Sequence, residues 1–169
     1  MSVVFFTDRD LGLKFPAILR DGGLVVERHG DHFASDCSDA EWLREVSRRG
    51  WVAVTHDRRI RYKPNELAAV IEHEAALLVV IGAAPYPDLA RSFVPTLPRI
   101  AEFLAAHERP LIGKVYVRAN RTSAGGNRIL VGPRLRTERR GGSGRQRRTG
   151  GVTGGPSNGR ILMTPSEPR

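Results

Sequence analysis

Cysteine is almost absent from the sequence, and long apolar runs are missing from it. Cys37 is the only cysteine among 169 residues, so an intramolecular disulfide is excluded and a cysteine-based zinc site lacks partners. The longest apolar run, Ala75 to Ala84, is far shorter than a membrane-spanning helix. Met1 to Thr7 carry no basic n-region of a secretory signal. We therefore expect a soluble protein of the cytoplasm with no membrane partner.

Net positive charge is missing from most of the chain and is concentrated at its end. The formal net charge is +9, but residues 1–117 hold 15 basic and 16 acidic residues, whereas residues 118–169 hold 12 and 2. The second segment is rich in Gly, Ser and Arg, a composition that buries too little apolar surface to offset chain entropy. We predict a folded domain over residues 1–117 and a disordered Arg/Gly-rich tail over residues 118–169. Such a tail either adds affinity for polyanions or is dispensable.

Short apolar runs alternate with segments of helical periodicity along residues 1–117. The runs predict strands over residues 3–7, 24–26, 51–55, 77–81 and 111–117. Helices are predicted to begin near Leu13, at Asp39 within a Ser38/Glu41 capping box, at Lys63, and at Leu89 with breaks at Pro95 and Pro98. Because parallel strands need helical crossovers, this alternation predicts an α/β fold, a three-layer α/β/α sandwich around a mostly parallel sheet.

Acidic residues follow the predicted strands. Asp8 and Asp10 come after the first strand and Asp57 after the third, while Asp39 starts a helix that leads back to the sheet. Ligands of open parallel sheets bind beyond the carboxyl ends of the strands. Carboxylates that converge there repel one another unless a cation neutralises them, and oxygen ligands suit Mg²⁺ or Mn²⁺. Taken singly, each acid also fits a helix cap or a turn.

Two stretches carry a family resemblance. Phe5-Phe6-Thr7-Asp8-Arg9-Asp10 resembles the opening of the PIN-domain nucleases, in which a strand ends in a metal-binding Asp. Ser38-Asp39-Ala40-Glu41-Trp42-Leu43, followed by Arg49-Gly50-Trp51-Val52-Ala53-Val54-Thr55-His56-Asp57, resembles the PIN pattern of a helix-starting Asp and a strand that ends in Thr-x-Asp. Within this family, the chain is similar to the small PIN-like toxins of the VapC type.

The resemblance implies a metal-dependent endoribonuclease, usually the toxin of a toxin–antitoxin pair. It implies Mg²⁺ or Mn²⁺ as the cofactor, RNA as the substrate, an antitoxin protein as a partner, and a possible homodimer. We assign Asp8, Asp39 and Asp57 as catalytic, with Asp8 and Asp57 as direct metal ligands. Asp39 either binds the metal through water or orients the nucleophile, and Asp10 either supports the ligands from behind or is an alternative ligand. Many PIN domains have one more acid, for which Asp31 and Asp36 are the candidates.

An acidic site needs bordering cations to bind RNA phosphates. The candidates for substrate binding are Arg9, Arg58, Arg59, Arg61 and Lys63, with Thr55 able to hold a carboxylate through its hydroxyl. A solvated charge run is the other interpretation of these cations.

Three other functions remain open. Asp8-x-Asp10 resembles the acid pair of haloacid-dehalogenase-like phosphatases, although their later Asp-Asp pair is missing. Asp57 resembles the phosphoacceptor of response-regulator receivers, although Lys114 lies inside the predicted strand instead of after it. The third alternative is an inactive PIN-like scaffold that binds a protein.

Overall fold

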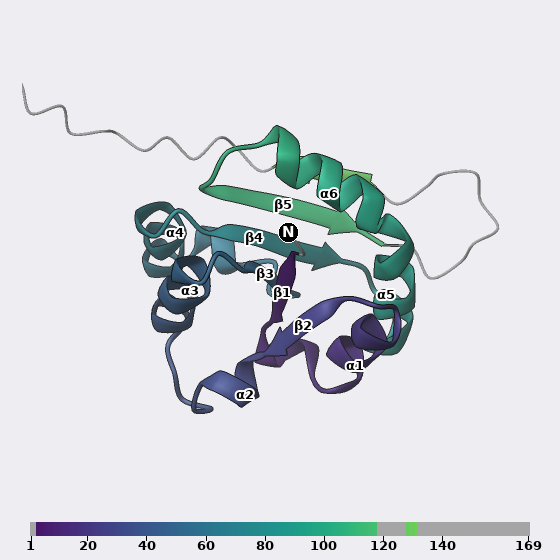
Figure 1. Cartoon of the computed structure of the whole chain (residues 1–169). Helices are drawn as coiled ribbons and strands as arrows, with labels where there is room; N and C mark the ends of the chain where they lie inside the picture. The colour runs from purple at the N-terminus through teal and green to yellow at the C-terminus, as the bar shows by residue number, and fades with distance from the viewer. Residues whose placement is uncertain (1–2, 118–127, 132–169) are drawn as a thin grey trace, which may run out of the picture. The chain divides into compact units, whose positions relative to one another are not determined.

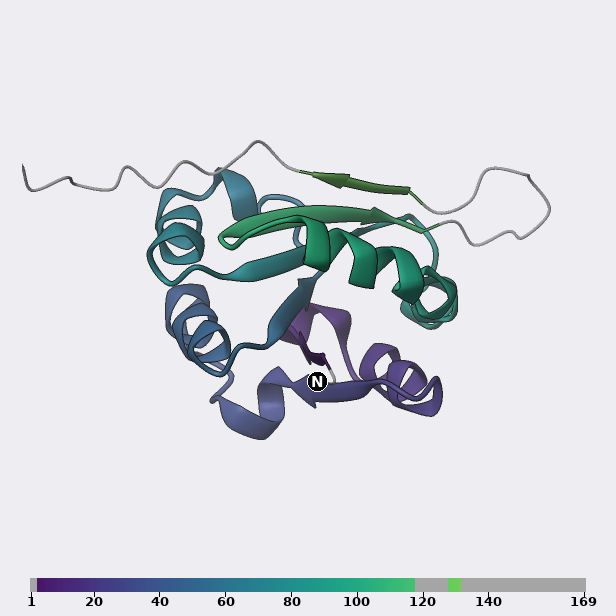
Figure 2. The same ribbon diagram turned by 45° about the horizontal axis from the view of Figure 1, so that its top comes forward.

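Six strands form the central sheet of the protein. The computed structural model describes residues 3–117 and 128–131. The strands are β1 (Val4–Thr7), β2 (Val25–Arg28), β3 (Val52–Thr55), β4 (Ala76–Ile81), β5 (Leu111–Tyr116) and β6 (Arg128–Val131). Their order is β2-β1-β3-β4-β5-β6. The first five are mutually parallel, and only β6 runs antiparallel to its neighbour β5. Figures 1 and 2 show this sheet between helices.

Helices connect the parallel strands and cover both faces of the sheet. The α-helices are α1 (Lys14–Asp21), α2 (His29–His32), α3 (Asp39–Arg48), α4 (Pro64–Glu72), α5 (Tyr86–Phe93) and α6 (Leu97–Ala106), and the 3₁₀ turns are η1 (Arg9–Leu11), η2 (Ile60–Tyr62) and η3 (Val94–Thr96). Helices α3 and α4 lie on one side of the sheet, and α1, α5 and α6 lie on the other (Figure 1). Within residues 3–117 and 128–131, no helix is long and apolar enough to span a membrane.

Alternation along each strand divides the apolar core into two clusters. Phe5, Val54 and Leu78 pack in one cluster with residues of α1, α5 and α6. Their strand neighbours Phe6 and Ala53 pack in the other, with Trp42, Leu43 and Val46 of α3. Because successive side chains of a strand point to opposite faces, apolar runs without polar alternation mark strands that are buried on both sides.

The predicted fold class and element positions are confirmed. All five predicted strands occur within a few residues of their predicted bounds, and α3 begins at Asp39 with both hydrogen bonds of the Ser38/Glu41 capping box. The last predicted helix is divided at η3, which contains Pro95. The sequence analysis did not predict α2. This single turn lies between the predicted strand at residues 24–26 and the predicted helix at Asp39, and it places the imidazole of His29 in the core beside Phe6 and Trp42.

Strand β6 lies beyond residue 117, where the sequence analysis ended the folded domain. It pairs with β5 from Arg128 to Val131, and the side chain of Ile129 packs against the core. The strand belongs to a compact unit that extends to Glu138. Apart from β6, the predicted disordered tail lies outside the residues that the structure describes.

The position of β6 predicts which truncations keep the domain stable. A chain ending at Glu138 retains β6 and should unfold at the temperature of the full chain. A chain ending at Asn120 loses the strand that covers β5, and its unfolding midpoint should fall by at least about 4 °C. Thermal unfolding followed by circular dichroism measures both. Equal midpoints for the two truncated chains would show that β6 contributes nothing to stability.

Candidate active site

The acidic residues gather where the chain changes direction along the sheet. From β1 the chain moves outward to β2 and then returns to the opposite side of β1 to form β3. The loops that follow β1 and β3 therefore diverge, and in open α/β sheets this switch point is where ligands bind. Asp8 follows β1 and Asp57 lies two residues beyond the end of β3, so the topology brings both to this crevice.

The Thr55 hydroxyl joins three of the predicted site residues. Its Oγ1 lies 3.0 Å from Oδ2 of Asp8 and 3.0 Å from Oδ2 of Asp10. The backbone N–H of Asp57 donates to the same oxygen at 3.1 Å. Asp8 also accepts from the backbone N–H of Arg9 at 2.7 Å, and Asp10 from that of His56 at 2.8 Å. Residues separated by some 45 positions in sequence are thus held around one buried hydroxyl.

This arrangement favours a proton on one of the two carboxyl groups. A hydroxyl donates one hydrogen and accepts two, so Thr55 can donate to only one of Asp8 and Asp10. Burial, followed by the charge of Asp10, raises the pKa of Asp8 to about 7. Burial also raises the pKa of Asp10, although hydrogen bonds from His56 and Thr55 oppose it. A protonated Asp8 that donates to Thr55 leaves the Thr55 hydroxyl free to donate to Asp10, and a bound cation would relieve the same repulsion.

Removing the Thr55 hydroxyl should destabilise the fold more than removing an equivalent hydroxyl elsewhere. Thr55→Val leaves two buried carboxyl groups without their shared partner and should lower the free energy of unfolding by about 2–3 kcal/mol. The matched control is Thr7→Val at the end of β1, because Thr7 is equally buried but its hydroxyl donates only to the Glu27 carbonyl, at 3.2 Å. Thr7→Val should lower the free energy of unfolding by about 1 kcal/mol. Urea unfolding measures both, and a smaller effect at Thr55 than at Thr7 would contradict the shared role.

Asp57 is held as an ionised carboxylate. Its Oδ1 accepts from the backbone N–H of Arg59 at 2.8 Å, and its Oδ2 lies 3.0 Å from Nζ of Lys63. Burial raises the pKa of Asp57, but these two interactions outweigh it and hold the pKa below its ordinary value. Asp57 therefore carries its charge throughout the neutral range.

Glu66 completes the acidic group, and the sequence analysis missed it. Glu66, in the first turn of α4, is 3.0 Å from Nζ of Lys63, and the same Nζ is 3.6 Å from Oδ2 of Asp39. Burial raises the pKa of Glu66, and the neighbouring Asp39 adds to the effect although Lys63 opposes it. Oδ1 of Asp39 accepts from the Trp42 indole at 3.0 Å. The sequence signal was present, since Pro64 at the helix start places Glu66 in the first turn.

The structure does not bring the other acid candidates to the acidic group. Asp31 forms a hydrogen-bonded ion pair with Arg28 and a second ion pair with Arg20 at 3.6 Å. Arg28 accordingly lowers the pKa of Asp31 despite some desolvation. Asp36 is exposed in the loop before α3. Neither residue therefore joins the acidic group, whereas Glu66 of α4 does.

The predicted substrate-binding residues have different surroundings. Arg9 donates to the carbonyls of Ser35 and Cys37 and lies 3.6 Å from Asp39. Arg58 donates to the Gly82 carbonyl at 2.8 Å, and the guanidinium of Arg61 stacks over the ring of Tyr62. The side chain of Arg59 is exposed. Thr55 is fully buried, so it positions carboxylates and cannot contact a substrate directly.

The donor set suits a hard divalent cation, although no metal cage is preformed. Oδ1 of Asp10 and Oε2 of Glu66 are buried and accept no hydrogen bond, and carboxylate oxygens of this kind are ligands for Mg²⁺ and Mn²⁺. Within residues 3–117 and 128–131, however, no three His, Cys, Asp or Glu side chains are grouped closely enough to hold a metal ion. The ligand chemistry therefore fits the cation, but the side chains must shift to enclose it.

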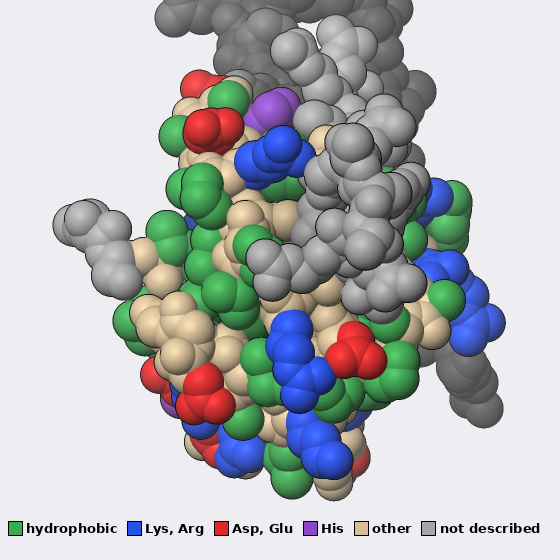
Figure 3. Space-filling model, turned by 90° about the vertical axis from the view of Figure 1, so that its right-hand side faces the viewer, with side chains coloured by type: hydrophobic (Ala, Val, Ile, Leu, Met, Phe, Trp, Pro, Cys, Tyr) green, Lys and Arg blue, Asp and Glu red, His purple; other side chains and the backbone are tan. Residues whose placement is uncertain are grey.

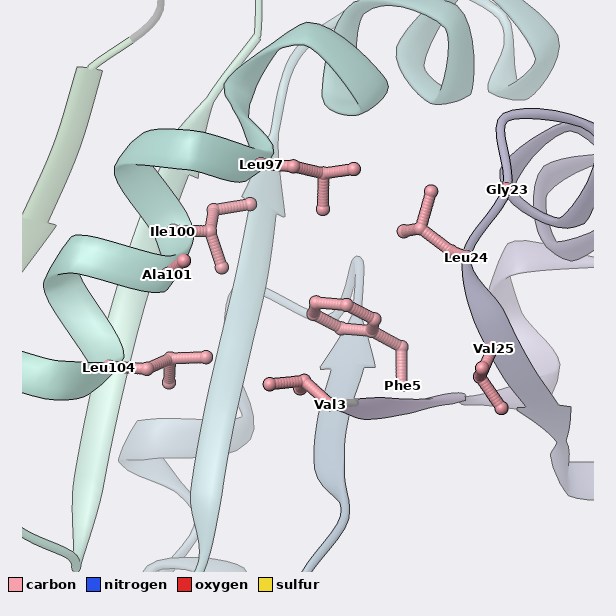
Figure 4. Close-up of a pocket in the computed structure, with 9 residues that line it drawn as sticks. All are labelled: Val3, Phe5, Gly23, Leu24, Val25, Leu97, Ile100, Ala101 and Leu104. Carbon is pink, nitrogen blue, oxygen red and sulfur yellow. The ribbon is translucent and has the colours of Figure 1, made fainter. Parts of the chain in front are cut away.

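A separate hollow lacks catalytic chemistry. About 200 Å³ of space lies between α6 and the β1–β2 side of the sheet, lined only by apolar side chains and Gly23. Figure 4 shows Leu97, Ile100 and Leu104 of α6 facing Phe5 and Leu24 across it. On the α1 and α5 side, shown in Figure 3, hydrophobic and basic side chains are intermixed. The acidic group at the switch point thus remains the candidate active site.

Comparison with protein families relates this α/β fold and its acidic group to a known family of domains. Residues 3–82 match the family described as PIN like domain. The matched region runs from β1 through β4 and includes every acid of the site. This supports the PIN-domain resemblance, and PIN-like domains are generally nucleases. No curated protein and no solved structure matches the chain.

Proposed function

We propose that this protein is an endoribonuclease that hydrolyses RNA phosphodiester bonds with Mg²⁺ or Mn²⁺. The observation that carries the proposal is the hydrogen bonding of the Asp8 carboxyl, the Asp10 carboxyl and the Asp57 backbone N–H to the Thr55 hydroxyl at the switch point of the sheet. The match of residues 3–82 to a PIN-like domain supports the same class of chemistry.

Each part of the site has a role in this reaction. Asp8, Asp10, Asp39 and Asp57, joined by Glu66, are the residues that would hold the cation. When bound, the cation supplies an activated water and neutralises charge on the phosphate that is attacked. Asp57 provides a permanent negative charge, while the protonation of Asp8 changes near neutral pH. Arg58 and Arg59, next to Asp57 in sequence, are the cations placed to attract phosphates of the RNA.

The biological setting is part of the proposal. By its resemblance to the small VapC-type toxins, we propose that the protein acts in the cytoplasm as the toxin of a toxin–antitoxin pair. An antitoxin protein would then be its partner, and a homodimer is a possible state. Growth arrest on expression, relieved by coexpression of a neighbouring antitoxin gene, would support this role.

A cleavage assay separates the nuclease from its rivals. The full chain, freed of metal with EDTA, should cleave single-stranded and hairpin RNA when Mn²⁺ is added and should be inactive without it. Hydrolysis of p-nitrophenyl phosphate without RNA cleavage would favour the phosphatase. Phosphorylation by acetyl phosphate would favour the receiver, which shares the strand order β2-β1-β3-β4-β5 and an Asp after β3. No activity in any of these assays would favour the inactive scaffold.

A further inference from the structure

Lys63 lies at the point where three acids of the site converge. Its Nζ is 3.0 Å from Asp57 and 3.0 Å from Glu66, and it is 3.6 Å from Asp39. These acids come from the loop after β3, from α4 and from α3, so the contacts join three separate segments. One ammonium group thus supplies the neutralising charge that the sequence analysis assigned to a metal ion.

The ammonium and a divalent cation cannot share these oxygens. Mg²⁺ binds carboxylate oxygens at about 2.0–2.1 Å and needs nearly octahedral surroundings. An ion in contact with an oxygen that now lies 3.0 Å from Nζ of Lys63 would lie within about 5 Å of the ammonium, where two positive charges repel strongly in a partly desolvated site. Occupation by the metal therefore requires Lys63 to move away.

Lys63 is also the member of the group that is free to move. Its side chain is 43% exposed, compared with 19% for Asp39, 28% for Asp57 and 14% for Glu66. Lys63 lies directly before α4, and the ring of Pro64 fixes the backbone conformation at the start of the helix. A flexible four-carbon stem can therefore swing into solvent without disturbing the helix.

We propose that Lys63 is an internal counter-cation that competes with the divalent metal for Asp39, Asp57 and Glu66. It keeps the acids together in the metal-free protein, sets the metal affinity, and leaves its position when the metal binds. The released ammonium remains beside the site, where a phosphate of the substrate is a suitable partner. This inference rests on the metal site of the proposed function.

Metal titration of a lysine variant tests the competition. Mn²⁺ binding to the metal-free full chain is measured by isothermal titration calorimetry for the wild type, for Lys63→Met and for the matched control Lys14→Met, which removes an exposed lysine at the start of α1. Loss of the competing charge should tighten Mn²⁺ binding by about 10-fold or more in Lys63→Met, a difference of about 1.4 kcal/mol. Lys14→Met should bind like the wild type. Equal or weaker binding by Lys63→Met would overturn the proposal.

Chemical labelling tests the movement in the unaltered protein, and it does not depend on the folding of a variant. The chain contains only three lysines, Lys14, Lys63 and Lys114. Brief acylation of amines, read by mass spectrometry, should modify Lys63 slowly in the metal-free protein and several-fold faster after addition of Mn²⁺. Lys14 should react at the same rate in both states. Labelling of Lys63 that stays constant or falls with Mn²⁺ would refute the displacement.

The two Lys63 experiments can be distinguished from a failure of the proposed nuclease function. Tighter Mn²⁺ binding by Lys63→Met together with metal-induced labelling supports the competition even if no RNA is cleaved. RNA cleavage by the wild type without either effect leaves the nuclease proposal standing and removes Lys63 as the competing cation.

Discussion

Replacing Asp57 by Asn should abolish the proposed Mn²⁺-dependent RNA cleavage, with an expected loss of about 100-fold or more. The substitution removes a negative charge that the pKa of Asp57, held below its ordinary value, keeps in place throughout the neutral range. Asn retains an oxygen that can accept from the Arg59 backbone N–H, so the turn after β3 should persist. Only the partly exposed ion pair with Lys63 is lost, and stability should change by less than about 1 kcal/mol.

Two controls accompany this measurement. Asp21→Asn alters an exposed aspartate at the end of α1 and should retain full activity. An identically purified Asp57→Asn preparation also reports any contaminating ribonuclease. Cleavage by Asp57→Asn at more than half of the wild-type rate would remove Asp57 from the active site, and with it the proposed arrangement of ligands.

The second large effect is a fall in the stability of the metal-free protein with rising pH, and Asp8→Asn should remove the part of this fall that comes from Asp8. The pKa of Asp8 is raised from 3.8 to about 7 on folding, mainly by burial. Folding therefore favours the protonated form. The contribution of the Asp8 carboxyl to the free energy of unfolding is fully present below pH 3.8 and is lost as the pH rises through about 7. Between about pH 5 and pH 8 the wild type should lose about 2–3 kcal/mol, because each unit of pKa difference corresponds to about 1.4 kcal/mol.

Urea unfolding in EDTA at several pH values measures this dependence. Asp8→Asn should show a flatter profile than the wild type and should exceed its stability at pH 8, because the amide is neutral and still able to donate to Thr55. Asp21→Asn should follow the wild-type profile. Addition of Mn²⁺ at pH 8 should stabilise the wild type and affect Asp8→Asn much less. A wild-type profile as flat as that of Asp8→Asn would show that Asp8 is already ionised in the folded protein.

The order of elements could be predicted because it depends on local patterns. Apolar runs such as Val52 to Val54 indicate strands that are buried on both faces, and the helix spacing between them indicates parallel pairing. The Ser38/Glu41 capping box identifies the start of α3 with its hydrogen-bonding partners three residues apart. The position of acids directly after strands was also enough to predict that Asp8, Asp10 and Asp57 lie at the same edge of the sheet.

Other features could not be predicted because they depend on contacts between distant segments. The apolar run of strand β6 is only three residues long, Ile129 to Val131, within an Arg- and Gly-rich stretch, and its pairing depends on the edge of β5. Glu66 reaches the site because α4 packs beside α3, whereas its own position in the sequence shows only a helix start. Lys63 was assigned to phosphate binding because charge alone does not show which acids surround a side chain.

By itself, the sequence determined the α/β class, the positions of the main helices and the strand ends at which the acids lie, since these follow from periodicity and capping over a few residues. Only the tertiary structure decided that Thr55 joins Asp8 to Asp10, that Glu66 enters the acidic group, and that Lys63 neutralises it. The physical reason is that burial and charge at each of these side chains come from neighbours that are remote in the chain and become close only when the strands and helices pack.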